Sequence, residues 1–136
     1  MRNALINSSP TPLNKFVVDN TAYSFTGNVS LSNVAVQIVR IGNVVTYYIP
    51  SAANVYNGSG NGYIETTFGL PVALRPITQV RQACVVLWGG TAQTGSMYID
   101  NLSGRITIWA TYGFHNFPFS GTNGFTPILG SYHTNP

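Results

Sequence analysis

The sequence is short of charged residues. Only nine of its 136 residues are Asp, Glu, Lys or Arg, whereas an average globular composition would give roughly 34. The shortage does not indicate disorder, because disordered chains combine high charge with low hydrophobicity and this chain is 44% hydrophobic. Gly, Asn, Ser and Thr take the place of the charges and supply 53 of the 136 residues. The surface is therefore expected to be polar but nearly neutral.

Long hydrophobic runs are missing as well. No stretch reaches the roughly 18 to 20 apolar residues of a membrane-spanning helix, so no membrane insertion is expected. Residues 1–12 (MRNALINSSPTP) lack the apolar core of roughly 7 to 15 residues that marks a signal peptide. If the protein acts outside a cell, we expect it to leave by another route, such as lysis.

Cysteine is almost absent, which bounds both the redox chemistry and the catalytic options. Cys84 is the single cysteine, so no internal disulfide can form, and synthesis in a reducing compartment fits. It lies in an apolar run, where a thiol is expected to be a small core residue with a raised pKa rather than a nucleophile paired with His115 or His133. These two histidines are not clustered with other ligands, and no phosphate-binding loop occurs. We expect no metal and no cofactor.

Acidic residues number three, and none lies near another in the sequence. A hydrolase needs groups that exchange protons or attack a substrate. It would therefore require two titratable groups to converge in one cleft, drawn from Asp19, Glu65, Asp100, His115 and His133. Each carboxylate is more simply explained as a turn residue or an arginine partner, and Asp100 stands where Asp starts turns. The favoured interpretation is that the protein is not an enzyme.

The net charge of +3 comes from basic residues that are scattered singly along the chain. Nucleic-acid-binding proteins usually cluster Lys and Arg on one face, because neutralising phosphates supplies most of their affinity. The high pI reflects few acids rather than a basic patch, so no nucleic-acid partner is expected.

Turn-forming residues punctuate the chain at short intervals, and β-branched and aromatic residues fill the gaps, which is typical of many short strands. In residues 28–38 the apolar alternation changes phase near Asn33, which predicts a bulge or a short turn. Residues 41–44 (IGNV) predict a two-residue hairpin, with a return strand to Ile49 that Pro50 ends. Residues 51–62 are expected to form a loop, with one helical turn as an option at 51–55.

The second half of the chain continues this pattern. Strands are predicted at 63–68 and, in a central position, at 79–88, with residues 70–76 extended between two prolines. A helix over 77–88 is the competing interpretation, which the lack of a 3.6-residue apolar period disfavours. Met97 to Tyr112 predict a hairpin about a turn at 100–104, with Ile106, Ile108, Ala110 and Tyr112 on one face. Residues 113–124 are expected to be a loop and 125–132 a closing strand.

Taken together, the elements predict an all-β protein of about eight to ten short antiparallel strands and no convincing helix. Regular strand spacing of this kind favours a jelly-roll-like β-sandwich. Residues 1–15 are expected to form an extended N-terminal arm, and residues 16–136 one sandwich domain.

An aromatic cluster near the C-terminus is the candidate site. Residues 112–119 (YGFHNFPF) hold four aromatic rings and one histidine, and rings in a loop must be covered by something. They plug one end of the sandwich, form a subunit interface, or provide a platform on which a sugar stacks. The candidate ligand or subunit-interface residues are Trp88, Tyr112, Phe114, His115, Phe117 and Phe119.

Four segments carry a resemblance to known proteins: residues 27–31 (GNVSL), 40–46 (RIGNVVT), 70–76 (LPVALRP) and 104–108 (GRITI). Together they resemble the distal domains of viral and phage fibres, in which a strand pair around GNVVT is followed by an LPxxxRP segment and a GxIxI hairpin. Small β-proteins of large DNA viruses, including the marseillevirus group, are similar, and trimeric jelly rolls of the tumour-necrosis-factor and C1q type are similar in architecture. The resemblance covers about residues 27–110 and implies a trimeric jelly-roll head on a virion, often with a role in attachment.

The low charge agrees with assembly, because interface cores are depleted in charge and closed symmetry satisfies adhesive surfaces. The strand spacing and the shortage of charge, together with what the resemblance to fibre domains implies, predict a non-enzymatic virion structural or surface protein, made in the host cytoplasm and forming a homotrimer. Other virion proteins or a host-surface glycan are the further partners expected. The alternative is a lectin-like carbohydrate-binding module that uses the aromatic loop.

Overall fold

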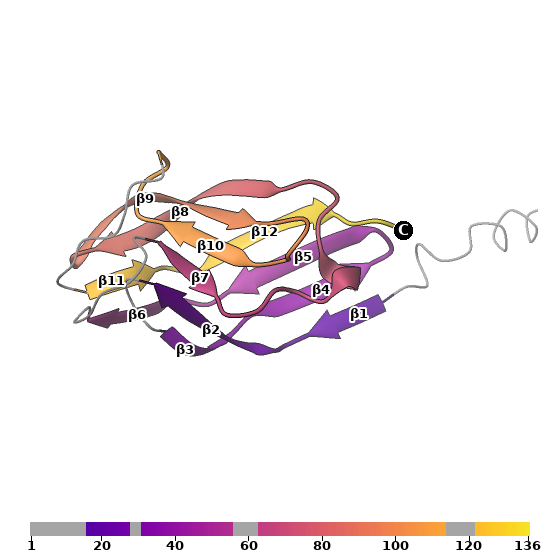
Figure 1. Cartoon of the computed structure of the whole chain (residues 1–136), viewed down its shortest axis with the longest axis horizontal. Helices are drawn as coiled ribbons and strands as arrows, with labels where there is room; N and C mark the ends of the chain where they lie inside the picture. The colour runs from indigo at the N-terminus through magenta and orange to yellow at the C-terminus, as the bar shows by residue number, and fades with distance from the viewer. Residues whose placement is uncertain (1–15, 28–30, 56–62, 114–121) are drawn as a thin grey trace, which may run out of the picture.

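The structure is a computed structural model that describes residues 16–27, 31–55, 63–113 and 122–136. Within these ranges the chain forms twelve β-strands and one short 3-10 turn, and no α-helix (Figure 1). Every strand pairing is antiparallel, and the strands build two sheets. The predicted all-β sandwich is confirmed, with more and shorter strands than expected. No helix in these ranges is long and apolar enough to cross a membrane.

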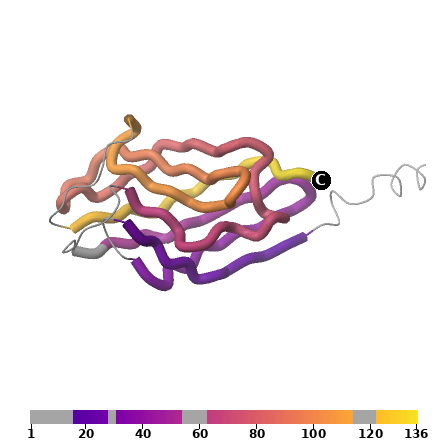
Figure 2. Tube along the Cα trace, viewed as in Figure 1, coloured from indigo at the N-terminus to yellow at the C-terminus, as the bar shows by residue number. Residues whose placement is uncertain are grey.

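The smaller sheet has four strands and contains both the first and the last strand of the described chain. Its order is β1 (Phe16–Asp19), β4 (Gln37–Ile41), β5 (Val44–Ile49) and β12 (Ile128–His133). The C-terminus lies at the same end of the molecule as the β4–β5 turn and the start of β1 (Figure 2). A hydrogen bond from the Thr134 amide to the Asn43 carbonyl, at 2.9 Å, ties the C-terminal residues to that turn.

The larger sheet has eight strands, ordered β3-β2-β7-β10-β9-β8-β11-β6. Its edge strands β3 and β6 contact each other, so the sheet curls toward a closed barrel. The strands are β2 (Ala22–Gly27), β3 (Leu31–Ala35), β6 (Ala52–Val55), β7 (Ile64–Thr66), β8 (Val80–Trp88), β9 (Thr91–Ile99), β10 (Ile106–Trp109) and β11 (Thr122–Phe125).

The core lies between the two sheets, and strands such as β5 and β10 contribute alternate apolar residues to it. In β5 these are Val45, Tyr47 and Ile49, and in β10 they are Ile106 and Ile108. The chain crosses between the sheets four times, after β1, β3, β5 and β11. Pro50 and Pro127 stand at two of these crossings, where the lack of an N–H prevents either strand from simply continuing.

Several local predictions are confirmed. Ile41 pairs with Val44 across the two-residue turn, and Gly42 supplies the positive φ of 63° that this turn requires. The change of phase occurs at Asn33, whose φ is 58°, where the pairing of β2 with β3 shifts register. The hairpin of β9 and β10 forms about the turn at 100–104, and β8 is internal to its sheet.

Other local predictions are wrong. Residues 52–55 form β6 rather than a loop or a helical turn, because β11 offers its free edge as a partner. The predicted closing strand at 125–132 is divided between β11 and β12, which belong to different sheets. The 70–76 segment contains the 3-10 turn η1 (Val72–Leu74). The predicted arm at 1–15 lies outside the described residues.

Gln82 interrupts the apolar face of β8 and serves as a polar link between the sheets. Its side-chain oxygen accepts a hydrogen bond from the Tyr47 hydroxyl on β5, and its amide donates to the Leu129 carbonyl on β12 at 2.7 Å. Burial raises the pKa of Tyr47 to about 12, so its hydroxyl keeps the proton that it donates. A polar residue at a core position is thus satisfied rather than strained.

Arg40 is a charged residue whose side chain is almost completely buried, with 1% of its surface exposed. Its guanidinium donates to the carbonyls of Gly42 at 2.7 Å and Asn135 at 2.8 Å, and to the carbonyl of Ala73. One side chain therefore joins the β4–β5 turn, the η1 turn and the C-terminal residues. Charge-assisted bonds to carbonyls compensate the cost of removing this cation from water.

Candidate functional site

The outer face of the eight-stranded sheet carries a row of polar and aromatic side chains. The strand register places Glu65 on β7 opposite Thr107 on β10, Thr107 opposite Tyr98 on β9, and Tyr98 opposite Arg81 on β8. Because residues directly opposite across antiparallel strands share one face, these four side chains form a continuous row. The apolar residues beside them in sequence, such as Ile64, point into the core.

An open groove of about 570 Å³ lies along this row, which we call the aromatic groove. Tyr63 and Trp109 pack against each other at its wall, with ring centroids 4.6 Å apart and planes inclined by 45°. Its lining includes Tyr63, Glu65, Tyr98, Asp100, Arg105 and Trp109. The three aromatic residues are half-buried, so each ring is anchored yet keeps part of its surface in solvent.

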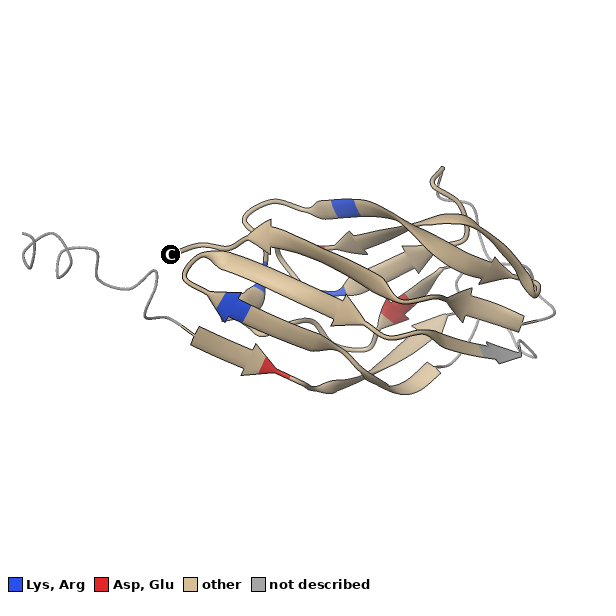
Figure 3. Ribbon diagram, turned by 180° about the vertical axis from the view of Figure 1, so that it is seen from behind, with Lys and Arg blue, Asp and Glu red and all other residues tan. Residues whose placement is uncertain are grey.

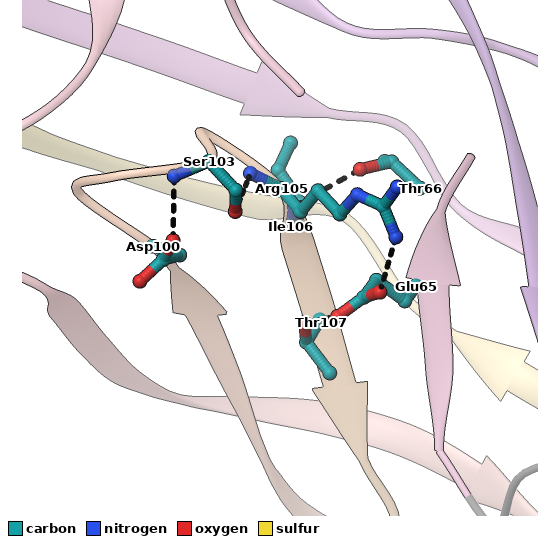
Figure 4. A network of polar contacts seen from close by, with 7 residues as sticks. All are labelled: Glu65, Thr66, Asp100, Ser103, Arg105, Ile106 and Thr107. Atoms are coloured by element: carbon teal, nitrogen blue, oxygen red, sulfur yellow. Dashed lines mark hydrogen bonds and ion pairs between the residues drawn. The ribbon is translucent and has the colours of Figure 1, made fainter. Parts of the chain in front are cut away.

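A polar network fixes the floor of the groove (Figure 4). Arg105 forms an ion pair with Glu65 at 3.1 Å, and the Thr107 hydroxyl donates to the other Glu65 oxygen at 2.7 Å. The backbone amide of Ile106 donates to the Thr66 hydroxyl at 3.1 Å. Glu65 is therefore held in one orientation by partners on the neighbouring strand β10 and in the turn before it.

Asp100 stands at the other side of the groove and organises the turn between β9 and β10. Its carboxylate accepts a hydrogen bond from the Ser103 backbone amide at 2.6 Å. The hydrogen bonds from Ser103 hold the pKa of Asp100 below its usual value, with a smaller contribution from the charge of Arg75. The predicted role of Asp100 as a turn residue is confirmed, and the carboxylate is ionised at neutral pH.

A hydrolase would require two of the five titratable groups in one cleft, and the groove does bring two together, Glu65 and Asp100. Both are already engaged as hydrogen-bond acceptors, and the lowered pKa of Asp100 makes it a poor proton donor. Asp19 lies elsewhere, bonded to Thr21 and to the Tyr23 hydroxyl, and His133 is on the four-stranded sheet. His115 lies outside the described residues.

Of the predicted site residues, the structure describes two. Trp88 is at the end of β8 with 43% of its surface exposed, and Tyr112 follows β10 with 48% exposed. The guanidinium of Arg81 lies over the Tyr112 ring, 4.0 Å from its centroid. The other four lie outside the described residues: Phe114, His115, Phe117 and Phe119.

The aromatic groove was missed by sequence reasoning because its rings come from separate strands. A signal was nevertheless present: Tyr98 and Trp109 occupy the polar parity of strands whose other parity is apolar, as in Met97-Tyr98-Ile99. Which rings meet depends on the strand order β7-β10-β9, which the sequence does not state.

Cys84 is a partly buried residue that packs against the core. Burial raises the pKa of its thiol to about 12, which confirms the prediction of a core residue with a raised pKa. Among the described residues no three His, Cys, Asp or Glu side chains gather in a way that could hold a metal ion.

The outer face of the four-stranded sheet differs from the groove. The register aligns Phe16, Ile41 and Val44 with His133 in one row, and places Leu129 opposite Tyr48 in another. Large apolar side chains are exposed here, with 62% of Phe16, 50% of Ile41 and 61% of Leu129 accessible. The five residues that we call the apolar patch are Phe16, Val18, Ile41, Val44 and Leu129.

Comparison with known proteins finds little that matches. No protein-family model matches the chain, and no curated protein matches it. Among solved structures, the chain is similar to the reovirus attachment protein sigma1, crystallised in complex with alpha-2,3-sialyllactose. The two share 11% sequence identity with a TM-score of 0.49, over 90% of this chain and 67% of the sigma1 chain.

Proposed function

We propose that the protein is a non-enzymatic structural protein of a virion surface, which forms a homotrimer and takes part in attachment. The resemblance of residues 27–110 to viral fibre domains supports the virion location and the trimer. The solved neighbour sigma1 is itself an attachment protein, which agrees with the proposal without carrying it. The observation that carries the assembly is the apolar patch.

The apolar patch spans all four strands of its sheet. Neighbouring strands are about 4.8 Å apart, so the Cα atoms of the outer strands are separated by roughly 14 Å. None of the outward-facing residues of these strands carries Asp, Glu, Lys or Arg, and Figure 3 shows how few charges the ribbon carries. An uncharged apolar face of this extent is typical of a surface that another protein covers.

The patch fits the centre of a subunit interface. Stable interfaces bury about 800 Å² on each partner, more than the patch alone supplies, so neutral polar neighbours must form the rim. Thr46 and Ser131 stand opposite each other within this face, between the row of Val44 and the row of Leu129, and Gln37 at the end of the face offers such a rim. A closed ring of three copies would cover the patch on every subunit without growing a fibre.

The state of the carboxylates supports a role without catalysis. Asp19, Glu65 and Asp100 each accept hydrogen bonds in the structure, and the bonds from Ser103 lower the pKa of Asp100. A general acid that works at neutral pH needs the opposite environment, one that raises its pKa.

The molar mass in solution tests the assembly. Size-exclusion chromatography with light scattering should give three times the chain mass of 14.7 kDa, or about 44 kDa, at micromolar concentration. A chain that remains a monomer at this concentration would overturn the proposed assembly. Species that grow without limit as concentration rises would overturn the closed ring.

A further inference from the structure

We propose that the aromatic groove on the outer face of the eight-stranded sheet binds a neutral saccharide. The inference rests on the proposed attachment role for its biological meaning, and it names the class of ligand. It concerns other residues than the aromatic cluster predicted at 112–119 and than the apolar patch. The geometry of three strands carries it.

The aromatic residues provide a stacking surface. Sugar rings present C–H groups on one face, and these pack well against the π-face of an aromatic ring. Trp109 and Tyr63 are inclined to each other by 45°, so together they form a bent wall rather than a flat stack. Tyr98, on the neighbouring strand β9, extends the apolar surface along the groove.

The polar residues supply hydrogen-bond acceptors in fixed positions. A carboxylate has about four lone-pair sites, and the two bonds from Arg105 and Thr107 leave Glu65 able to accept more. Asp100 and the exposed side chain of Gln79 face the same groove. Sugar hydroxyls donate readily to such groups, which are held in place before any ligand arrives.

The charge of the groove selects against anionic ligands. Among the lining residues, Glu65 and Asp100 bring two negative charges, and the positive charge of Arg105 is already paired with Glu65. Arg75 contributes a positive charge near Asp100, and Arg81 lies at the far end of the row, where it is engaged by an aromatic ring. A sialylated or sulfated glycan would bring its negative charge beside the two carboxylates of the lining. The volume of about 570 Å³ is in the range of small-molecule sites, and the groove is open to solvent, which suits the end of a glycan chain.

The two tryptophans of the chain allow a direct test. The Trp88→Ala variant keeps Trp109 as its only tryptophan, so its emission reports on the groove. We expect a saturable change in this emission when at least one neutral methyl glycoside is added, from a panel of galactose, glucose, mannose and N-acetylglucosamine. Lactose and alpha-2,3-sialyllactose form a matched pair, and we expect the sialylated sugar to bind more weakly.

Saturation-transfer NMR with the neutral sugars then assigns the site. Trp109→Ala should weaken binding at least tenfold, and the milder changes Glu65→Gln and Gln79→Ala about threefold to tenfold. Trp88→Ala is the matched control and should leave the affinity unchanged. Circular dichroism verifies that each variant is folded, and the conservative variants keep the test valid if Trp109→Ala does not fold.

Three results would overturn the proposal: no neutral sugar binds the folded wild type, the groove variants bind as well as wild type, or sialyllactose binds better than lactose. Light scattering on the same samples separates this failure from that of the proposed assembly. A trimer that binds no sugar would refute the groove alone, whereas a monomer that binds sugar would refute the assembly alone.

Discussion

The two sheets direct their charged side chains to opposite sides. On the four-stranded sheet, Asp19 and Arg40 point inward. Asp19 accepts a hydrogen bond from the Tyr23 hydroxyl, and Arg40 donates to backbone carbonyls. On the eight-stranded sheet, Glu65 and Arg81 face outward, toward solvent. One outer face is therefore apolar and neutral, and the other is polar and charged.

This difference decides what each face can contact. Covering a charge with another protein removes it from water, and the cost is recovered only if the charge is well paired. The apolar patch carries no such cost, so a second copy of the chain can cover it. The groove retains its charges and suits a hydrated ligand that brings its own hydrogen bonds. The two surfaces lie on different sheets and can therefore act at the same time.

The largest effect is expected when a charge is placed on each outer face in turn. Ile41→Lys puts a cation between Phe16 and Val44 in the apolar patch, where assembly would bury it unpaired, and we expect the trimer to dissociate. Ala83→Lys places the same charge on an exposed outward position of β8 and should leave the molar mass of the trimer in solution unchanged. Light scattering measures both, and equal behaviour of the two variants would contradict the proposed interface.

A second test compares a buried with an exposed arginine. Arg40→Met removes three charge-assisted bonds and leaves their carbonyls poorly satisfied, which should lower the free energy of unfolding by about 3 kcal/mol. Arg105→Met breaks an exposed ion pair and should cost about 0.5 kcal/mol or less. Urea denaturation measures both. If Arg105→Met proved the more costly, the assigned roles of the two charges would be reversed.

The smallest effect is expected for Asp100, the carboxylate at the side of the groove opposite Glu65. The folded state lowers the pKa of Asp100, so its carboxylate stabilises the fold above the unfolded value near 3.8. This contribution is lost as the pH falls through the lower, folded pKa. Wild type should therefore exceed Asp100→Asn in stability by more at pH 6 than at pH 2.5. Urea midpoints at the two pH values measure this, and an unchanged difference would contradict the role assigned to the Ser103 bonds.

Local features were the predictable part of the fold. The hairpin at 41–44 follows from Gly42 in a two-residue turn, and the turn at 100–104 follows from Asp100, because both depend on residues adjacent in sequence. β6 was not predictable, since its residues pair with β11, which is some seventy positions later. The same limit hid the groove, whose rings come from β9, β10 and the residue before β7.

The abundance of strands, the tight turns, the burial of Cys84 and the shortage of charge follow from the amino-acid sequence alone, because they depend on side-chain type and short-range spacing. The positions of the charges follow from the tertiary fold, because the order of strands sets which outward residues become neighbours. Alternation assigns each side chain to one of two faces, and the packing of the two sheets decides which face is core and which meets solvent. That choice turned Arg40 into a buried anchor and Glu65 into part of an open groove.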